Sequence, residues 1–379
     1  MEWIDRKLEK QFSKGLSQGK VTIVYGARRV GKTSLIERYW SEQKHLKRFV
    51  GTGDDIDLRN ILGSERLSTI NAAFKGYDIV FIDEAQRIPK IGLALKLLID
   101  ANPTMTVIAS GSSSFELANQ IGEPLTGRQK TYTLFPLSVG ELVAHFGAMS
   151  VIQNLHQYLI YGSYPEVLTL HNELEKKAYL TELRNAYLFK DILELEHIKN
   201  AAKLIDLLKL IAFQIGKEVS LNELSRSLGI AKQTVERYLD LLEKAFIIVR
   251  VRAYSTNQRQ EISKSSRFYF WDNGVRNSII QNFNDSSTRM DMGMLWENFC
   301  FVERLKKQHD EAIFCNTYFW RTYDQQEIDL IEERDGSLFA FEFKWNPNKK
   351  AKIPKAFATL YPEAMFECVS PANFLAFLE

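Results

Sequence analysis

A glycine-rich segment near the N-terminus has the spacing of a phosphate-binding loop. Residues 26–33 read Gly-Ala-Arg-Arg-Val-Gly-Lys-Thr, which fits the pattern GxxxxGK(S/T). The glycines let the backbone wrap so that successive N–H groups point at phosphate oxygens, and the following helix adds its positive N-terminal end. In this pattern Lys32 reaches the β- and γ-phosphates of ATP and the Thr33 hydroxyl ligates Mg²⁺. We predict that the following residues bind the cofactor: Gly26, Ala27, Arg28, Arg29, Val30, Gly31, Lys32, Thr33 and Ser34.

Two adjacent carboxylates follow an apolar run further along the chain. Asp83 and Glu84 end the run that covers residues 78–83. Behind a phosphate-binding loop, the first carboxylate can hold Mg²⁺ and the second can orient or deprotonate the attacking water. We therefore assign Asp83 to the metal and cofactor site and Glu84 to catalysis, although two acids after a strand could also simply cap a helix. Ser112, in the turn at residues 110–113, offers a hydroxyl to the γ-phosphate, and an ordinary helix N-cap explains that turn almost as well.

A second set of acidic residues lies in the last part of the chain. Glu297 falls on a predicted helix, Asp329 in a predicted strand, and Glu342 in the next strand. Lys344 shares a face with Glu342, because residues two apart in a strand point the same way. Asp329 and Glu342 could then bind a second Mg²⁺, with Lys344 beside the attacked phosphate and Glu297 in support. We predict a catalytic role for all four, although charged residues alternate on many solvated strand faces. A lysine-rich segment at residues 349–355 suits a phosphate backbone or a plain exposed helix.

The elements that must position these residues change along the chain. Apolar runs at residues 21–25, 78–83 and 106–110 alternate with helical patterns, which is typical of a parallel α/β sheet. A helix is predicted over residues 32–40, directly after the loop. From about residue 154 to 213 the pattern becomes helical and runs of β-branched residues disappear, which indicates a helical lid after the α/β core.

A different pattern covers residues 219–271. Helices over residues 221–228 and 232–244 are separated by a turn at Gly229, and two strands that could pair as a hairpin follow. This order is typical of a winged helix-turn-helix. Residues 217–267 hold ten basic and six acidic side chains, an excess of four, and winged helices also bind proteins, so DNA and a protein partner both stay open. The residues that begin the second helix, where a recognition helix meets bases and phosphates, are Lys232, Gln233, Thr234 and Arg237.

The composition is that of an ordinary globular protein. Of its 379 residues 45% are hydrophobic and 25% are charged, and the net charge is only +2, so any nucleic-acid surface must be local. The cysteines Cys300, Cys315 and Cys368 form no CxxC pair, which argues against a zinc site or disulfide framework and favours a reducing compartment. The N-terminus lacks the apolar core of a signal peptide, and no run approaches the ~18 apolar residues of a membrane span. We therefore predict a soluble cytoplasmic protein without a membrane partner.

Several short motifs together resemble those of one known family. They are Asp-Glu-Ala-Gln at 83–86, Ser-Gly-Ser-Ser at 110–113, Leu-Thr-Gly-Arg at 125–128, Leu-Phe-Pro-Leu-Ser at 134–138, Tyr-Gly-Ser-Tyr-Pro-Glu at 161–166 and Phe-Lys-Asp-Ile at 189–192. They closely resemble motifs of prokaryotic AAA+ ATPases that carry a C-terminal domain of formerly unknown function, and the resemblance spans nearly the whole chain. It implies an AAA+ core and a C-terminal domain similar in fold to PD-(D/E)xK nucleases. The set Glu297, Asp329, Glu342 and Lys344 resembles the constellation of those nucleases.

The resemblance also implies a role for Arg128. By its place in the motif it is the candidate γ-phosphate-sensing or finger arginine, and an arginine there neutralises charge in the transition state. A surface arginine in an ion pair is the alternative. Whether Arg128 acts within its own chain or on a second subunit stays open, and the AAA+ resemblance makes a homo-oligomeric ring conceivable.

The predicted fold is α/β and comprises four domains. They are a P-loop AAA+ core over residues 1–150, a helical lid over 151–213, a winged helix-turn-helix over 214–285 and a restriction-endonuclease-like α/β domain over 286–379. The predicted activity is Mg²⁺-dependent binding and hydrolysis of ATP, coupled to DNA binding and, with an active nuclease-like domain, to DNA cleavage. The alternative is a nucleotide-dependent switch or scaffold that binds a protein partner and has an inactive nuclease fold. ATP and Mg²⁺ are the expected cofactors.

Overall fold

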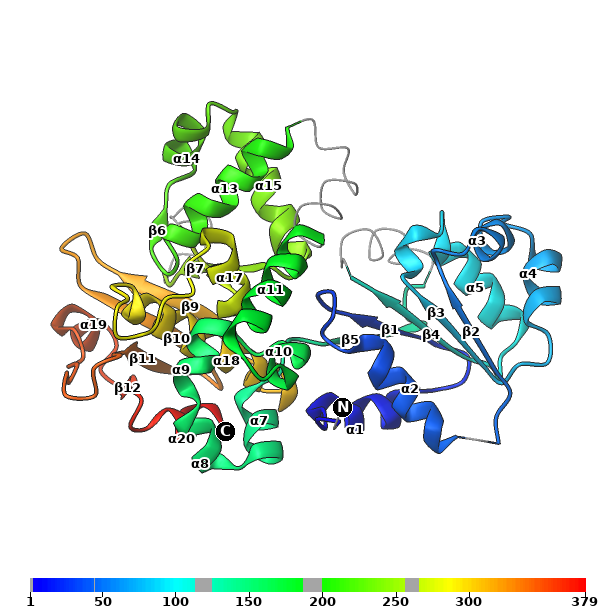
Figure 1. The fold of residues 1–379 in the computed structure, drawn as a ribbon, viewed down its shortest axis with the longest axis horizontal. Helices are drawn as coiled ribbons and strands as arrows, with labels where there is room; N and C mark the ends of the chain where they lie inside the picture. Colours follow the sequence, from blue (N-terminus) through cyan, green and yellow to red (C-terminus); the bar gives the residue numbers. More distant parts are fainter. Residues whose placement is uncertain (1–2, 44, 113–124, 187–199, 256–265) are drawn as a thin grey trace. The chain divides into compact units, whose positions relative to one another are not determined.

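The structure is a computed structural model that describes residues 3–43, 45–112, 125–186, 200–255 and 266–379 (Figure 1). The described residues divide into two compact units. The first, here called the loop unit, comprises residues 5–135 and 244–246, and the second, the C-terminal unit, comprises the other described residues. Each is described by itself below.

The loop unit is built on a parallel sheet. Its strands are arranged in the order β2-β3-β4-β1-β5, and every neighbouring pair is parallel. The strands β1, β3 and β4 are buried almost throughout, as their runs of Val, Ile and Phe predict for the centre of a parallel sheet. The predicted strands at 21–25, 78–83 and 106–110 are therefore confirmed. The five strands are β1 (Val21–Tyr25), β2 (Arg48–Thr52), β3 (Ile79–Asp83), β4 (Thr106–Gly111) and β5 (Gln129–Thr133).

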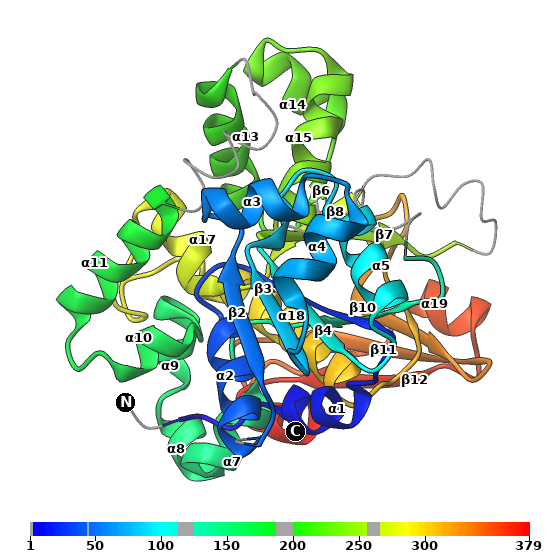
Figure 2. The ribbon, with the colours of Figure 1, turned by 90° about the vertical axis from the view of Figure 1, so that its right-hand side faces the viewer.

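Helices cover this sheet and complete its core (Figure 2). Apolar side chains of α4 and α5, such as Phe74 and Leu98, pack with Val80 and Val107 of the strands. Because the strands are parallel, their carboxyl ends lie at one edge, which is where ligands bind in open α/β sheets. The helical elements are α1 (Lys7–Gly15), α2 (Lys32–Glu42), α3 (Ile56–Leu62), α4 (Leu67–Phe74), η1 (Ala85–Arg87) and α5 (Ile91–Ala101).

The C-terminal unit begins before the predicted boundary at residue 150. Helix α7 already belongs to it, because Val139 and Leu142 are part of the unit's apolar core and are not part of the core of the loop unit. Ser138 caps α7 through a capping box with Glu141, which fixes where the helix starts. The helices of this first part are α7 (Val139–Phe146), α8 (Ala148–Gln153), α9 (Leu155–Tyr161), α10 (Pro165–Thr169), α11 (Glu173–Leu183) and α13 (Ala201–Phe213).

Two helices and a hairpin follow as the sequence predicts. The turn between α14 (Leu221–Leu228) and α15 (Lys232–Lys244) is at Gly229, whose φ of +65° is in the left-handed region that favours glycine. Strand β7 (Ile248–Ala253) pairs antiparallel with β8 (Ser266–Phe270), which confirms the predicted hairpin. Short β6 (Glu218–Val219) pairs with the other edge of β8.

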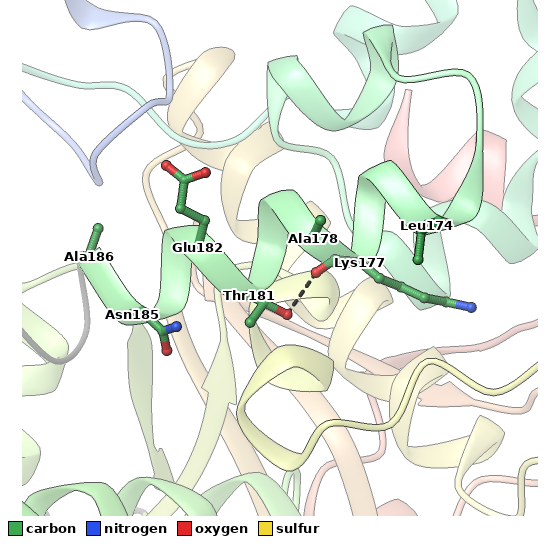
Figure 3. A pocket seen from close by; sticks show the side chains of 7 residues that line it. All are labelled: Leu174, Lys177, Ala178, Thr181, Glu182, Asn185 and Ala186. Atoms are coloured by element: carbon green, nitrogen blue, oxygen red, sulfur yellow. Dashed lines mark hydrogen bonds between the residues drawn. The ribbon is translucent and has the colours of Figure 1, made fainter.

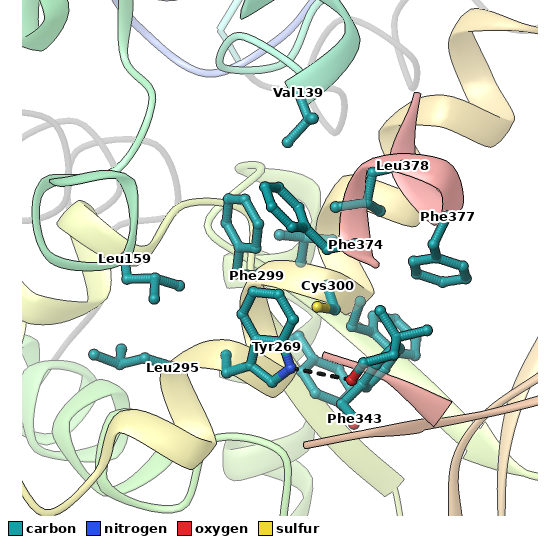
Figure 4. Packing of buried hydrophobic residues seen from close by; sticks show 14 of the residues in the cluster. Val139, Leu159, Tyr269, Leu295, Phe299, Cys300, Phe343, Phe374, Phe377 and Leu378 are labelled. Atoms are coloured by element: carbon teal, nitrogen blue, oxygen red, sulfur yellow. Dashed lines mark hydrogen bonds between the residues drawn. The ribbon is translucent and has the colours of Figure 1, made fainter. Parts of the chain in front are cut away.

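These strands continue into the C-terminal sheet. Strand β7 pairs with β9, so that seven strands form one sheet in the order β12-β11-β10-β9-β7-β8-β6. The predicted domains 214–285 and 286–379 therefore share one sheet, a non-local pairing that no local sequence pattern reveals. The apolar core of this unit includes Phe299 and Cys300 together with Phe374 and Phe377 (Figure 4). The elements of this part are α17 (Asn273–Ile280), α18 (Met292–Asp310), β9 (Asn316–Arg321), β10 (Glu327–Arg334), β11 (Ser337–Phe343), α19 (Lys355–Leu360), β12 (Met365–Val369) and α20 (Phe374–Leu378).

Candidate functional site

The glycine-rich segment forms a loop between β1 and α2. Gly26 has a φ of +151° and Gly31 a φ of +96°, conformations that side chains rarely adopt. A Cβ on Gly26 would also clash with the carbonyl oxygen of Leu134. Ala27 and Val30 are buried, while Arg29 and Ser34 are exposed. The two glycines are therefore required by backbone geometry, as the predicted phosphate-binding loop demands.

Lys32 is a buried cation under this loop. Its Nζ donates hydrogen bonds of 2.9 Å to the carbonyl oxygens of Gly26 and Ala27, and the residue is only 6% exposed. Burial lowers the pKa of Lys32 to about 8, while the carboxylates of Glu84 and Asp83 act in the opposite direction. A negatively charged phosphate at the loop would stabilise the charged form of this buried ammonium group.

Asp83 lies at the carboxyl end of β3, next to the start of α2. Its Oδ2 accepts a hydrogen bond of 2.8 Å from the Thr33 hydroxyl. Its Oδ1 accepts from the Ser110 hydroxyl and, at 3.0 Å, from the backbone N–H of Glu84. A hydroxyl and a carboxylate are oxygen ligands of the kind that Mg²⁺ prefers. Thr33 and Asp83 thus fit the predicted Mg²⁺ site.

Glu84 is held by two neighbouring polar side chains. Its Oε2 accepts hydrogen bonds from Gln86 Nε2 at 2.5 Å and from Ser112 Oγ at 3.3 Å. The backbone of Glu84 has a φ of +47°, an uncommon conformation for a residue with a side chain. Gly53 leaves room for this turn, since a Cβ there would clash with the Glu84 carbonyl oxygen. Sequence reasoning quoted Gln86 only as part of a motif and missed its contact with Glu84.

Arg6 also contacts the loop and was missed by sequence reasoning. It is buried, and it donates hydrogen bonds from Nη1 to the carbonyl oxygen of Val30 at 2.7 Å and from Nη2 to that of Phe135 at 2.6 Å. In a trans peptide the C=O and the next N–H point in opposite directions, so a fixed Val30 carbonyl also fixes the N–H of Gly31. No motif surrounds Arg6, and only the tertiary structure reveals this contact.

Arg128 lies away from this loop. It directly precedes β5, and its carbonyl oxygen accepts a hydrogen bond from Val21 N–H at the start of β1. The glycine-rich loop follows the other end of β1, which is five residues or roughly 16 Å long. The Arg128 side chain forms an ion pair with Asp100 of α5. Arg128 therefore does not reach the loop of its own unit, and a role on a second subunit stays a prediction.

Two parts of the predicted site cannot be placed. Ser113 of the serine-rich turn and the lid motif at 189–192 lie outside the described residues. None of the predicted site residues lines a hollow of about 700 Å³ on α11 (Figure 3). Its lining residues are Leu174, Lys177, Ala178, Thr181, Glu182, Asn185 and Ala186.

The acidic residues of the C-terminal unit gather around an arginine. Glu297 lies on α18, Asp329 on β10 and Glu342 on β11, as predicted, and Lys344 follows β11. Lys344 Nζ lies 2.5 Å from Glu342 Oε1. Arg267 of β8 points its Nη1 at Glu297 Oε1 and Asp329 Oδ1, each at 3.5 Å, and its Nη2 at Glu327 Oε2, at 2.8 Å. We call Glu297, Glu327, Asp329 and Glu342 the acidic cluster.

The predicted second Mg²⁺ would have to bind at this cluster. Among the residues that the structure describes, no three His, Cys, Asp or Glu side chains are arranged to hold a metal ion. Burial raises the pKa of Glu297 well above its usual range and raises that of Asp329, and burial together with the Asp329 carboxylate raises the pKa of Glu342 to about 7. Arg267 Nη1 faces Asp329 Oδ1, one of the two predicted metal ligands, and the metal site at Asp329 and Glu342 stays a prediction.

Comparison with known families divides the chain into three parts. Residues 18–143 match the AAA domain, and residues 152–286 and 292–371 match two different domains of unknown function. The AAA match includes the glycine-rich loop, Asp83 and Glu84, and it supports an ATPase of the AAA+ kind that binds and hydrolyses a nucleotide. Within the described residues, no helix combines the length and apolar character that a bilayer span requires.

Relatives align along most of the chain. An uncharacterized protein of Mycobacterium tuberculosis is 26% identical over 347 residues, which cover 89% of this chain and 73% of the relative. An uncharacterized protein of Methanocaldococcus jannaschii is 23% identical over 363 residues, which cover 90% of this chain and 79% of the relative. Among solved structures, AMPPCP-bound DnaA from Aquifex aeolicus is 14% identical with a TM-score of 0.29, covering 62% of this chain and 85% of DnaA, and this likeness supports no conclusion.

Proposed function

We propose that the chain is a Mg²⁺-dependent ATPase in which ATP binding and hydrolysis by the loop unit are coupled to DNA binding by the C-terminal unit. The observation that carries the ATPase part is the hydrogen bond of 2.8 Å between Thr33 Oγ1 and Asp83 Oδ2, beside the buried Lys32. Residues 50 positions apart in the sequence thereby supply the oxygen ligands and the cation that a nucleoside triphosphate with its Mg²⁺ requires.

Each residue of this site has a chemical role in the proposal. The N–H groups of the loop, with the Gly31 N–H oriented through Arg6, donate to phosphate oxygens. Lys32 balances the charge of the β- and γ-phosphates, and Thr33 and Asp83 hold Mg²⁺, which neutralises charge on the transferred phosphoryl group. Glu84 accepts a proton from the attacking water, and Gln86 and Ser112 keep its carboxylate in position.

The DNA part of the proposal rests on α14, α15 and the hairpin that follows. We assign them to a winged helix-turn-helix, with the start of α15 as the recognition segment. Lys232, Gln233 and Arg237 are exposed there, and Thr234 is half-buried. Exposed basic and amide side chains at the start of a recognition helix suit contacts with phosphates and base edges.

One observation favours a second candidate function. Arg267 lies among the carboxylates of the acidic cluster, which argues against metal-dependent cleavage there. The alternative is a nucleotide-dependent switch that binds a protein partner through α15. In either case we propose that Arg128, which is ion-paired with Asp100 within its own unit, acts on a second copy of the chain in a homo-oligomer.

An ATPase assay with and without duplex DNA separates these functions. We expect the double substitution Lys232→Ala and Arg237→Ala to weaken DNA binding by at least about tenfold and to abolish any stimulation of the ATPase by DNA. Lys209→Ala, an exposed lysine on α13, is the matched control and should behave like the wild type. If DNA neither binds nor changes the rate of ATP hydrolysis, the DNA part is wrong and the switch on a protein partner is favoured.

A further inference from the structure

Arg267 faces three of the four carboxylates of the acidic cluster, those of Glu297, Glu327 and Asp329. We infer that its guanidinium occupies the position that a divalent cation would need. The cluster is then a structural ion-pair network and not a metal-dependent cleavage centre. Nη1 lies 3.5 Å from both Glu297 Oε1 and Asp329 Oδ1, and Nη2 lies 2.8 Å from Glu327 Oε2. The Arg267 side chain is 3% exposed, so its charge is held inside the unit.

The carboxylate oxygens that face Arg267 are already engaged. Asp329 Oδ2 accepts from the backbone N–H of Phe343 at 2.9 Å, while its Oδ1 faces Arg267. Glu297 Oε1 accepts from the Tyr269 hydroxyl at 2.8 Å. Gly216 closes that side, since a Cβ there would lie 2.6 Å from Glu297 Oε1. An incoming cation would have to displace these donors.

The two oxygens of Glu342 have different surroundings. Its Oε1 faces Lys344 Nζ, and its Oε2 is buried without a hydrogen-bond partner among the described residues. One such oxygen supplies only one of the six ligands that Mg²⁺ takes in near-octahedral geometry. Loss of Arg267 would add Asp329 Oδ1 and Glu297 Oε1 to the oxygens that a cation could use.

The charges of the site are consistent with an arginine in place of a metal. Four carboxylates face two cations, Arg267 and Lys344, which leaves an excess of two negative charges if all groups are ionised. Burial raises the pKa of Glu297, Asp329 and Glu342, which favours their uncharged forms and acts against this excess.

The ion pairs of Arg267 also join separate elements of the unit. Arg267 belongs to β8 of the hairpin, whereas its partners come from α18 and β10. Its guanidinium lies over the ring of Phe319 on β9 as well, at 4.6 Å from the ring centroid. Removal of this buried cation leaves three carboxylates uncompensated, and we expect Arg267→Gln to lower the Tm of the C-terminal unit by about 5–10 °C.

The test counts Mn²⁺ ions bound by the full-length, nucleotide-free chain. All proteins carry Asp83→Asn, so that any bound ion can be attributed to the C-terminal unit even if the empty nucleotide site binds Mn²⁺ against our expectation. Mn²⁺ binding is measured by calorimetry, and Tm is measured with and without Mn²⁺. The series consists of the Asp83→Asn parent, Arg267→Gln, the pair Arg267→Gln and Asp329→Asn, and Arg250→Gln. Arg250 is the matched control because this arginine of β7 forms its ion pair with Glu243, which lies outside the acidic cluster.

The inference predicts no bound Mn²⁺ in the parent and one in Arg267→Gln. That ion should restore most of the lost Tm and should disappear when Asp329→Asn is added, while Arg250→Gln gains none. Mn²⁺ bound by the parent and lost on Asp329→Asn would overturn the inference, and so would a folded Arg267→Gln that binds no ion. If Arg267→Gln does not fold, Asp329→Asn is made alone in the parent. Metal-dependent DNA cleavage by the parent that is lost in Asp329→Asn would then contradict a structural ion-pair network.

Discussion

The chain has two groups of acidic residues beside strands, and their surroundings are opposite. Asp83 and Glu84 accept hydrogen bonds from the neutral side chains of Thr33, Ser110, Gln86 and Ser112. The acidic cluster of the C-terminal unit instead faces the guanidinium of Arg267 and the ammonium of Lys344. Carboxylates near a strand end thus do not by themselves indicate a metal site.

What distinguishes the two groups is the partner that already neutralises them. Hydroxyl and amide donors carry no net charge and leave the negative charge of Asp83 available to Mg²⁺. A buried guanidinium satisfies both charge and hydrogen bonds, and a metal ion would have to compete with it. We therefore propose nucleotide chemistry for the loop unit and a structural role for the acidic cluster.

Removal of the buried cation at the loop should have the largest effect. Lys32→Ala should lower the rate of ATP hydrolysis on the order of 100-fold or more, because the buried ammonium that balances the charge of the phosphates is lost. Phosphate release from ATP measures this. Lys75→Ala, an exposed lysine at the end of α4, should hydrolyse ATP like the wild type. A Lys32→Ala protein that hydrolyses ATP at a rate within a fewfold of the wild type would contradict a role of the loop in hydrolysis.

The role of Glu84 in the same site can be separated from binding. Glu84→Gln should lower kcat on the order of 100-fold, because a carboxamide cannot accept the proton of the attacking water. The affinity for ATP should stay within about threefold, since Glu84 acts in the reaction and not in the binding of phosphates. Calorimetry with ATP and a turnover assay give the two values, with Glu37→Gln on the exposed face of α2 as control. A parallel loss of binding would contradict the proposed role of Glu84.

The Arg6 contact should have an intermediate effect. Arg6→Ala removes two hydrogen bonds, to Val30 and Phe135, and leaves the Gly31 N–H without a fixed direction. We expect ATP affinity to fall by about tenfold, the size of one charge-assisted hydrogen bond. Lys10→Ala, exposed on the neighbouring helix α1, is the control. An unchanged affinity for ATP in a folded Arg6→Ala protein would show that Arg6 only supports the fold.

The smallest effect concerns pH. The free protein has a Lys32 pKa of about 8, and a bound triphosphate favours the charged ammonium, so the charged form binds ATP more tightly. The Kd for ATP should therefore be constant below pH 8 and rise by up to about tenfold per pH unit above it. Lys32→Arg should remove this dependence even if it binds ATP more weakly, because arginine stays charged. The same rise of the Kd for ATP in Lys32→Arg would mean that another group causes the pH dependence.

Sequence reasoning worked best where chemistry depends on short spacing. The positions of Gly26, Gly31, Lys32 and Thr33 follow from one motif, since the loop conformation that they need is local. Asp83 was predicted because it ends an apolar strand. The strands and helices that carry these residues were predicted for the same reason, from apolar runs and caps.

Contacts across the fold were not predictable in this way. Arg6, Gln86 and Arg267 each act on a residue that only tertiary structure brings near, and no motif surrounds them. The pairing of β7 with β9 likewise joins strands that the sequence assigned to different domains. Arg128 shows the converse, because a motif suggested a place at the nucleotide and the register of β5 puts it at the opposite end of β1.

The most direct test of the comparison is the number of Mn²⁺ ions bound by the wild-type chain without and with a non-hydrolysable ATP analogue. The account predicts no bound ion without the analogue and one with it, and that ion should be lost in Asp83→Asn and kept in Asp329→Asn. An ion bound without the analogue and lost in Asp329→Asn, or no ion bound with the analogue, would contradict it.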